Sequence, residues 1–365
     1  MAPLPAATEP DLAAIAETVA AGGRISDAEA LRLLACDDLT WLGRLAEIRR
    51  YQKVPERRVT FIVDRNVNYT NVCITRCRFC AFYRLPNDPE GYVLSREEIF
   101  AKIDELLDHG GHQLLLQGGH HPGLGIEWFE GLFRAIKERY PQIHLHALSA
   151  SEIAHIARRS RLSLAETLRR LRAAGLDSIP GAGAEILDDR VRRAIAPYKE
   201  TTEGWLAVMR EAHRQGLPTS ATMMYGTVED DAAIVAHLRA IRDLQDETGG
   251  FVAFIPWAFQ PQGTELGRAS RRGAVAYLRI LAVSRIYLDN IDHLQASWVT
   301  QGEKIGQLAL FYGADDMGST MLEENVVSAA GCTFRLGRAE LKRLIEAAGF
   351  TAALRDQRYR ILGPA

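Results

Sequence analysis

Short apolar runs alternate with longer amphipathic segments from about Val59 onward, and this alternation constrains the fold more than any other feature. Short apolar runs are typical of buried strands, and longer stretches with apolar residues at helical spacing are typical of helices. Their alternation predicts strand–helix units around a parallel sheet. The predicted strands are Val67–Val72, Gln113–Gln117, Ile143–Leu148, Ser178–Pro180, Thr219–Tyr225, Val252–Pro256, Leu294–Val299 and Leu308–Tyr312. The predicted helices are Ser95–His109, Glu127–Tyr140, Ser163–Ala174, Glu203–Gln215, Asp230–Glu247 and Arg271–Asn290.

Eight strands in a chain of this length predict a closed (β/α)8 TIM-type barrel of the α/β class, with an open doubly wound sheet as the alternative. Residues 1–58 are predicted to form an N-terminal helical extension, because Asp11–Ala21 and Ser26–Arg50 both show helical spacing. We expect the barrel at 59–332 and a C-terminal packing segment at 333–365, with a helix from residue 338 to about 349.

Composition narrows the classes of partner. The formal net charge is −2 and the pI is about 6.6, which indicates neither a nucleic-acid nor a membrane-surface partner. No apolar run approaches the roughly 18–20 residues of a membrane span. Acidic residues interrupt the alanine-rich N-terminus, and it has no basic region as a signal peptide would. We therefore expect a reducing, cytoplasmic location, where clustered cysteines bind metals or act in catalysis.

Three of the five cysteines, Cys73, Cys77 and Cys80, follow the first predicted strand within a few positions. Their spacing would also suit one face of a helix, but the preceding Val67–Val72 run and the intervening polar residues favour a loop. Structural zinc almost always takes four protein ligands, and no further cysteine or histidine pair follows at a suitable distance. Three thiolates suit an iron–sulfur cube that leaves one iron open to a small molecule.

The active site of a TIM barrel lies at the carboxyl ends of its strands. The residues that follow the predicted strands are therefore the candidates for chemistry. Besides the cysteines, they include Gln117–His121, His146, Ser149, Gly181–Glu185, Gly226–Glu229, Trp257–Pro261, Thr300–Gly302 and Gly313–Asp316.

The CxxxCxFC pattern of Cys73, Cys77, Phe79 and Cys80 resembles the motif of the radical S-adenosylmethionine (SAM) enzymes. This resemblance implies a barrel of the radical SAM kind and a 4Fe–4S cluster held by the three cysteines. It further implies that the open iron binds S-adenosylmethionine, from which a 5′-deoxyadenosyl radical is generated. By the same resemblance Phe79 lies against the adenine, and Tyr83 belongs to the cofactor-binding set.

Gln117, Gly118 and Gly119 are similar to the family's stretch at the methionine amino group. Glycine suits such a site because its backbone can approach a ligand closely. His120 stands where many members have an acid.

Two more stretches resemble cofactor motifs of this family. Thr222–Glu229 is similar to the adenine motif, with Gly226 in place and Thr222 instead of the first glycine. In related barrels an acid and an arginine after the fourth strand hold the ribose and the methionine carboxylate, which implies these roles for Glu185 and Arg190. The same two residues would also suit an exposed helix start.

Longer stretches resemble one branch, which contains the menaquinone enzymes of the futalosine route and the deazaflavin (F0) synthase subunits. They are Asp64–Cys73, Cys80–Arg84, Ser178–Gly181, Ala296–Gly302 and Gly318–Asn325. The resemblance implies a cyclase of menaquinone biosynthesis acting on dehypoxanthine futalosine. The substrate ribose would lose hydrogen from C4′, and the carbon radical would add to the benzoate ring. The alternatives are a synthase that keeps the adenosyl group in its product, an F0-synthase-like enzyme, and a metal-binding scaffold without turnover.

This reaction needs a base for the ring proton and contacts to the ribose, for which His146, Tyr225, Glu229, Asp315 and Asp316 are candidates. His146 and His144 share one strand face, and both would also suit hydrogen-bonded barrel filler. Trp257 and Trp298 are candidates for apolar walls, and Cys36 and Cys332 are interpreted as structural. We expect a small-molecule substrate and an electron donor such as flavodoxin or ferredoxin.

Overall fold

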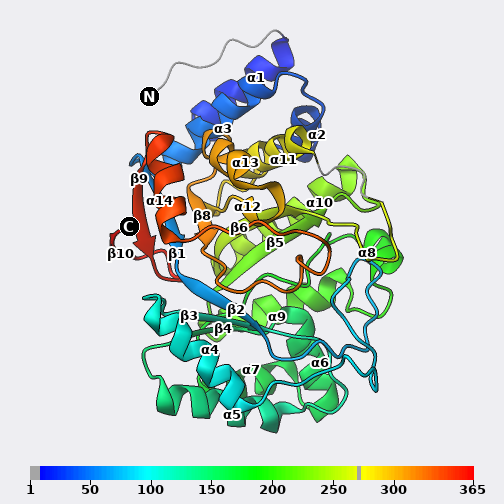
Figure 1. The fold of residues 1–365 in the computed structure, drawn as a ribbon. Coiled ribbons are helices and arrows are strands. Elements are labelled where there is room, and N and C mark those ends of the chain that lie inside the picture. Colours follow the sequence, from blue (N-terminus) through cyan, green and yellow to red (C-terminus); the bar gives the residue numbers. More distant parts are fainter. Residues whose placement is uncertain (1–8, 269–272) are drawn as a thin grey trace.

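The computed structural model describes residues 9–268 and 273–365 and shows a barrel capped by a helical extension (Figure 1). The extension contains α1 (Pro10–Ala20), α2 (Asp27–Leu34) and α3 (Leu39–Lys53). The segment predicted as helical at Ser26–Arg50 contains two helices, α2 and α3, so the prediction of one continuous helix is wrong. Asp38 ends the segment between the two helices and caps α3, because its carboxylate accepts the backbone N–H of Trp41 at 2.8 Å.

Parallel strands close into a ring of eight positions. The strands are β1 (Arg58–Ile62), β2 (Asp64–Asn68), β3 (Gln113–Gln117), β4 (His144–Ala147), β5 (Thr219–Tyr225), β6 (Phe251–Ala258), β7 (His293–Leu294) and β8 (Asp316–Ser319). β1 and β2 follow each other along the chain and together occupy the first position of the ring. The fourth position, between β4 and β5, is occupied by residues 178–179, which form single bridges to both neighbours. β8 pairs with β1 and closes the ring, so the predicted barrel is confirmed over the open sheet.

Helices follow the strands around the outside of this ring (Figure 1). They are α4 (Arg96–Asp108), α5 (Ile126–Arg139), α6 (Ala150–Ser160), α7 (Leu164–Ala174), α8 (Asp189–Ile195), α9 (Thr202–Arg214), α10 (Asp231–Thr248), α11 (Ala274–Tyr287), α12 (Trp298–Gln301), α13 (Glu303–Leu308) and α14 (Arg338–Ala347). The six predicted barrel helices are all present within one to three residues, although the start predicted at 271–272 lies outside the described residues. Within the described ranges, no helix combines the length and the hydropathy needed to cross a membrane.

The last two predicted strands are wrong in position. Leu308–Tyr312 contains the end of α13 and the short 3-10 helix Ala309–Phe311, and the eighth strand is instead β8. The seventh strand covers only two residues, and Trp298 and Val299 of the predicted strand begin α12. Very short strands have no room for a periodic pattern, whereas the apolar Leu308–Tyr312 run resembles a buried strand.

The C-terminal segment adds to the barrel sheet. β9 (Thr351–Arg355) pairs in parallel with β1, and β10 (Ile361–Pro364) pairs antiparallel with β9 (Figure 1). Arg355 contacts the first residue of β8, and the Tyr359 ring stacks on His293 at the start of β7, with centroids 3.8 Å apart. The segment 355–359 thereby covers the N-terminal end of the barrel and forms its floor.

Candidate active site

The three clustered cysteines lie on an irregular loop that leaves the carboxyl end of β2. Cys73, Cys77 and Cys80 line one cavity of about 230 Å³ at this end of the barrel. The loop contains no helix, so the alternative of a helical stripe is excluded. Burial raises the pKa of the Cys77 and Cys80 thiols above the ordinary value.

Backbone hydrogen bonds hold this loop from several sides. Cys73 donates its N–H to the Arg84 carbonyl at 2.9 Å, which folds the loop back on itself. Arg78 donates its N–H to the carbonyl of Ile195 at the end of α8, at 2.8 Å. The thiols are therefore presented by backbone that is tied to the barrel.

The glycine pair presses directly against the cysteine loop. Gly119 donates its N–H to the Thr70 carbonyl at 3.0 Å. A β-carbon at Gly119 would lie 2.3 Å from the Val72 carbonyl oxygen, and one at Gly118 would lie 2.7 Å from the Tyr69 ring. Only glycine permits this approach. Both glycines also line the cysteine cavity.

One buried carboxylate, that of Glu152, joins three elements beside the cavity. It accepts the N–H of Gly118 and the hydroxyl of Tyr69, both at 2.9 Å, through Oε1. Through Oε2 it accepts the N–H and hydroxyl of Ser149, so the capping box of α6 also positions the glycine pair. Sequence reasoning missed Glu152, although the Ser-x-x-Glu spacing at the start of α6 was a recognisable signal.

An ion pair provides the polar wall opposite the cysteines. Lys199 Nζ lies 2.6 Å from Glu185 Oε1 and 5.5 Å from the centroid of the Phe79 ring. Burial opposes the charge of Lys199, but the neighbouring acidic groups, Glu185 first among them, together outweigh burial and raise the lysine pKa. Oε2 of Glu185 is buried without a hydrogen-bond partner and is therefore open to a ligand donor.

Arg190 lies outside this cavity, contrary to the expectation for it. Its side chain is 58% exposed, and its guanidinium pairs with Asp230 at 3.0 Å. Arg190 belongs to α8, which begins at Asp189 on the surface, so the alternative of an exposed helix start is the correct one. The cation beside Glu185 is Lys199, which the sequence analysis did not identify.

The remaining cofactor-binding predictions divide into two groups. Phe79, Tyr83 and Gln117 line the cysteine cavity together with Thr222 and His120. Gly226 does not, because it lies beyond the end of β5 in a turn with φ of 97°. Its N–H donates to the carboxylate of Glu229, which also accepts the Thr227 N–H at 2.9 Å and thereby holds this turn.

The donor set discriminates between the two metal interpretations. Among the described residues, no three His, Cys, Asp or Glu side chains converge closely enough to bind a single ion. This argues against a four-ligand zinc site. Thiols around the wall of one cavity, each able to reach a different iron, fit a cube with three protein ligands.

A second cavity of about 300 Å³ fills the barrel interior beneath the first. Gln117, Thr222 and Trp257 line both cavities, so the two adjoin. The polar residues of this chamber include Asp64, Asn66, Gln113, His146, Ser220, Gln295, Arg355, Gln357 and Tyr359, and Trp298 supplies apolar surface.

His146 is the one proposed base that lines the chamber. It is buried, and its Nδ1 lies 2.7 Å from the Ser178 hydroxyl. Tyr225 and Glu229 lie outside both cavities, so the structure does not support them as bases. Tyr225 is fully buried, and Glu229 is occupied by its own turn.

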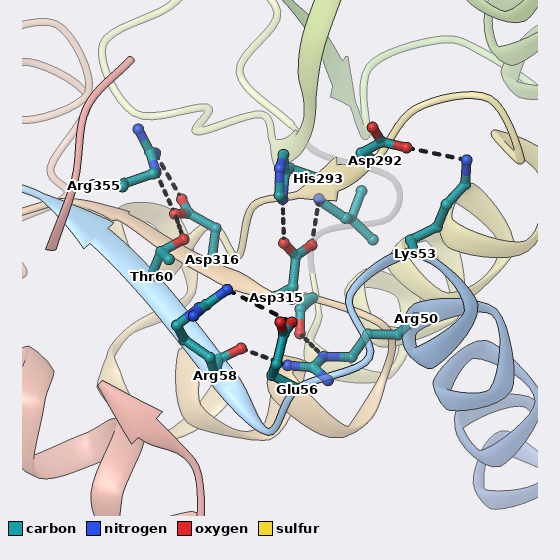
Figure 2. Close-up of polar contacts among 12 residues, drawn as sticks. Arg50, Lys53, Glu56, Arg58, Thr60, Asp292, His293, Asp315, Asp316 and Arg355 are labelled. Carbon is teal, nitrogen blue, oxygen red and sulfur yellow. Dashed lines mark hydrogen bonds and ion pairs between the residues drawn. The ribbon is translucent and has the colours of Figure 1, made fainter. Parts of the chain in front are cut away.

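Asp315 and Asp316 are at the wrong end of the barrel for the predicted role. Asp316 begins β8, where its carboxylate accepts Arg355 Nη2 at 2.9 Å and the Thr60 hydroxyl at 2.6 Å (Figure 2). Asp315 forms an ion pair with Arg285. Its carboxylate also accepts His293 Nδ1 at 2.6 Å (Figure 2). The misplaced eighth strand explains the error, because Asp315 precedes the true strand and Asp316 begins it. Both carboxylates act as structural ion pairs.

Several chamber residues could not be identified from the sequence. Asp64 accepts the Ser319 hydroxyl and the Gln113 amide N–H, and Gln357 reaches the interior from the C-terminal segment. The outlying Cys36 and Cys332 are both buried and line neither cavity.

Comparison with known proteins agrees with this geometry. Residues 67–241 match the radical SAM superfamily, and residues 248–363 match the CofH/MqnC C-terminal region. The fold resembles methylornithine synthase (TM-score 0.74, 20% identity, 93% of this chain and 97% of that one). It also resembles the hydrogenase maturase HydG (TM-score 0.75, 17% identity, 95% and 77%).

The chain belongs to the radical SAM superfamily, whose enzymes use a 4Fe–4S cluster and S-adenosylmethionine. Cyclic dehypoxanthine futalosine synthase of Streptomyces coelicolor is 48% identical (96% of this chain, 89% of the relative). The synthase of the same name from Halalkalibacterium halodurans is 44% identical (95% and 94%). Aminodeoxyfutalosine synthase of Thermus thermophilus is 40% identical (96% and 96%).

Proposed function

We propose that this protein is a radical SAM cyclase that converts dehypoxanthine futalosine to cyclic dehypoxanthine futalosine in menaquinone biosynthesis. The relatives of that name, 48% and 44% identical over almost the whole chain, support this substrate over that of the 40% identical aminodeoxyfutalosine synthase. The structural observation that carries the proposal is the adjoining pair of cavities, one walled by three cysteines and one enclosed in the barrel.

Cys73, Cys77 and Cys80 are proposed to hold the cluster, with Gly118, Gly119, Phe79 and Tyr83 around the bound S-adenosylmethionine. When bound, this pair would supply a carbon radical for hydrogen abstraction. The free Oε2 of Glu185 can accept a hydrogen bond from an amino or hydroxyl group, and the adjacent Lys199 can meet a carboxylate.

The barrel chamber is proposed to bind the substrate. A carbon radical has no charge to steer it, so the chain must hold the ribose carbon close to the arene and exclude water. Trp257 and Trp298 provide flat apolar walls for this purpose, and polar side chains of the floor such as Gln357 provide donors for the carboxylate. We infer a cytoplasmic location and a small electron carrier, such as flavodoxin or ferredoxin, as the reductant.

An anaerobic assay tests this function directly. The cluster is reconstituted, S-adenosylmethionine, dithionite and dehypoxanthine futalosine are added, and products are analysed by mass. We expect free 5′-deoxyadenosine and a product lighter than the substrate by two hydrogen atoms. A product that contains the adenosyl group would instead show the synthase reaction, and no cleavage of S-adenosylmethionine would refute the enzyme.

Cysteine variants test the ligand set. Cys77→Ala is expected to lose the iron, the visible absorbance and all cleavage of S-adenosylmethionine. Cys36→Ala is the matched control, because Cys36 is equally buried but packs in the helical extension. Equal iron content in the two variants would contradict the assignment.

A further inference from the structure

Two histidines of β4 are joined through one serine of the neighbouring strand position. His146 Nδ1 lies 2.7 Å from the Ser178 hydroxyl oxygen, and His144 Nε2 lies 2.7 Å from the same oxygen. Ser178 is fully buried. Residues two positions apart on a strand point to the same face of the sheet. The rings of His144 and His146 can therefore both reach the same hydroxyl on the neighbouring strand position.

The two rings open into different spaces. His146 lines the barrel chamber, whereas His144 lines a separate cavity of about 250 Å³ at the N-terminal end of the barrel. Arg355 and Gln357 line both cavities, so the C-terminal segment is the partition between them. The hydrogen-bonded row of His146, Ser178 and His144 therefore links the two cavities through the barrel wall, beside the C-terminal segment.

The hydrogen-bond partners define one consistent direction along this row. Gln357 Nε2 can only donate, so the contact of 3.3 Å with His146 Nε2 makes that nitrogen the acceptor. His146 must then carry its proton on Nδ1 and donate it to Ser178. The Ser178 hydroxyl is left to donate to His144 Nε2. Every proton in the row is thus used once. The lone pair of His146 Nε2 accepts from Gln357, which also lines the chamber, so this amide must turn away before the nitrogen can take a proton.

We propose that His146 is the base of the cyclisation and that Ser178 and His144 carry its proton through the barrel wall to the lower cavity. This inference rests on the proposed function. When the ribose carbon has bonded to the arene, the ring carbon must lose a proton and one electron to become aromatic again. His146 Nε2 takes the proton, and the electron would pass to a one-electron acceptor of the iron–sulfur class. The Nδ1 proton passes to Ser178, whose own proton passes to His144.

Burial keeps both rings neutral before the reaction. It holds the pKa of His146 well below its usual range, so the ring is neutral and has a lone pair for a proton. Burial also lowers the pKa of His144, and of the charges around that ring Asp177 and Asp356 raise the pKa, whereas Lys137 and Arg358 lower it. Asp177 also accepts Lys137 Nζ and the Leu145 N–H, which places a carboxylate beside the outer end of the relay.

Asp64 is the rival base in the chamber. Both of its oxygens already accept hydrogen bonds, from Ser319 and from Gln113, and within residues 9–268 and 273–365 no second titratable side chain is hydrogen-bonded to it. A proton taken by Asp64 would therefore have no described hydrogen-bonded path out of the chamber. His146 differs from Asp64 in having a hydrogen-bonded path by which its proton can leave the chamber.

Single- and multiple-turnover assays with dehypoxanthine futalosine separate the base from the relay. We expect His146→Gln to form 5′-deoxyadenosine while its yield of cyclic product falls about tenfold or more, because a general base typically contributes at least that much. Ser178→Ala should complete its first turnover within about twofold of the wild type but lose about tenfold in later turnovers, because His146 can accept one proton but cannot release it. Ser178→Thr, which keeps the hydroxyl, should recover the later turnovers.

Ser284→Ala is the matched control. Ser284 is also fully buried, but its hydroxyl donates only to the Ile280 carbonyl within α11. Equal multiple-turnover rates for Ser178→Ala and Ser284→Ala would overturn the relay. If His146→Gln kept the wild-type yield of cyclic product, or if Asp64→Asn lost that yield instead, the assignment of His146 as the base would be overturned.

A second readout does not depend on turnover. In ¹⁵N NMR spectra of the cluster-free protein, both histidines should carry the proton on Nδ1, and Ser178→Ala should shift the imidazole signals of both. Signals that are unchanged by Ser178→Ala would refute the hydrogen-bonded row. If the wild type forms no cyclic product while the NMR coupling is present, the proposed function fails and the row itself is real.

Discussion

At the scale of single residues, the site depends on positions where the backbone of one loop contacts the backbone of a neighbouring loop. The glycine pair after β3 and the cysteine loop after β2 share such a contact. Spacing alone identified both motifs, but the reason that Gly119 must be glycine is its distance from the Val72 carbonyl, which is a property of the fold.

Gly119→Ala should displace the cysteine loop. Its β-carbon would meet backbone atoms of Val72, which cannot rotate away as a side chain could. We expect a loss of about 1–3 kcal/mol in unfolding free energy and a reduced iron content after reconstitution. Gly123→Ala is the control, since its nearest neighbour would be the side chain of His121 at 3.1 Å. Normal iron content in Gly119→Ala would contradict this contact.

The buried carboxyl of Asp64 should make stability depend on pH. Burial raises its pKa from the ordinary 3.8 to about 6. The folded protein thus holds this proton more tightly than the unfolded chain, and stability falls as pH rises from about 4 to about 6. The shift corresponds to about 3 kcal/mol.

Asp64→Asn removes this penalty. Its amide could also donate to Oε1 of Gln113, which has no partner. In urea unfolding, the stability of the variant relative to the wild type should increase by about 3 kcal/mol between about pH 4 and about pH 7. A difference that does not vary with pH would show that Asp64 is not the titrating group.

At the scale of elements, helix starts determine how precisely the site is held. Three helices, α2, α4 and α6, begin with a full Ser-x-x-Glu capping box. Two of these serve only their own helix on the surface. In α6 the same motif also anchors the glycine pair through Glu152, so a local sequence signal has a long-range consequence.

Ser149→Ala and Ser95→Ala separate these two effects. Both variants lose the hydroxyl of a capping box, which costs about 1 kcal/mol in unfolding free energy. We expect only Ser149→Ala to weaken S-adenosylmethionine binding to the reconstituted protein, measured by calorimetry, because Glu152 then loses one of its anchors. Equal binding by the two variants would show that the cap does not position the glycines.

At the scale of the whole molecule, the C-terminal segment completes the barrel. Residues 355–359 close the N-terminal end, and Arg355 forms a buried pair with Asp316. The chamber is therefore complete only when the C-terminal segment that contains β9 packs against the barrel strands.

Arg355→Met tests this closure. It leaves Asp316 buried without its counter-ion, and we expect a loss of about 3–5 kcal/mol in guanidinium unfolding. Arg360→Ala, which removes an exposed pair with Asp356, should cost less than about 1 kcal/mol. Adding Asp316→Asn to Arg355→Met should restore part of the stability. No restoration would indicate that lost packing, and not the uncompensated charge, is responsible.

Local patterns in the sequence were enough to predict the barrel class, most of its helices and the three cysteines with their glycine pair. These features are local because periodicity lies within one element and the cysteine motif lies within one loop. Long-range packing, in contrast, places Lys199 and not Arg190 beside Glu185, puts Asp315 and Asp316 at the floor, and forms that floor from residues 355–359. Such pairings join residues far apart in the chain through close packing, and the short β7 and β8 carry no periodic pattern from which their register could be derived.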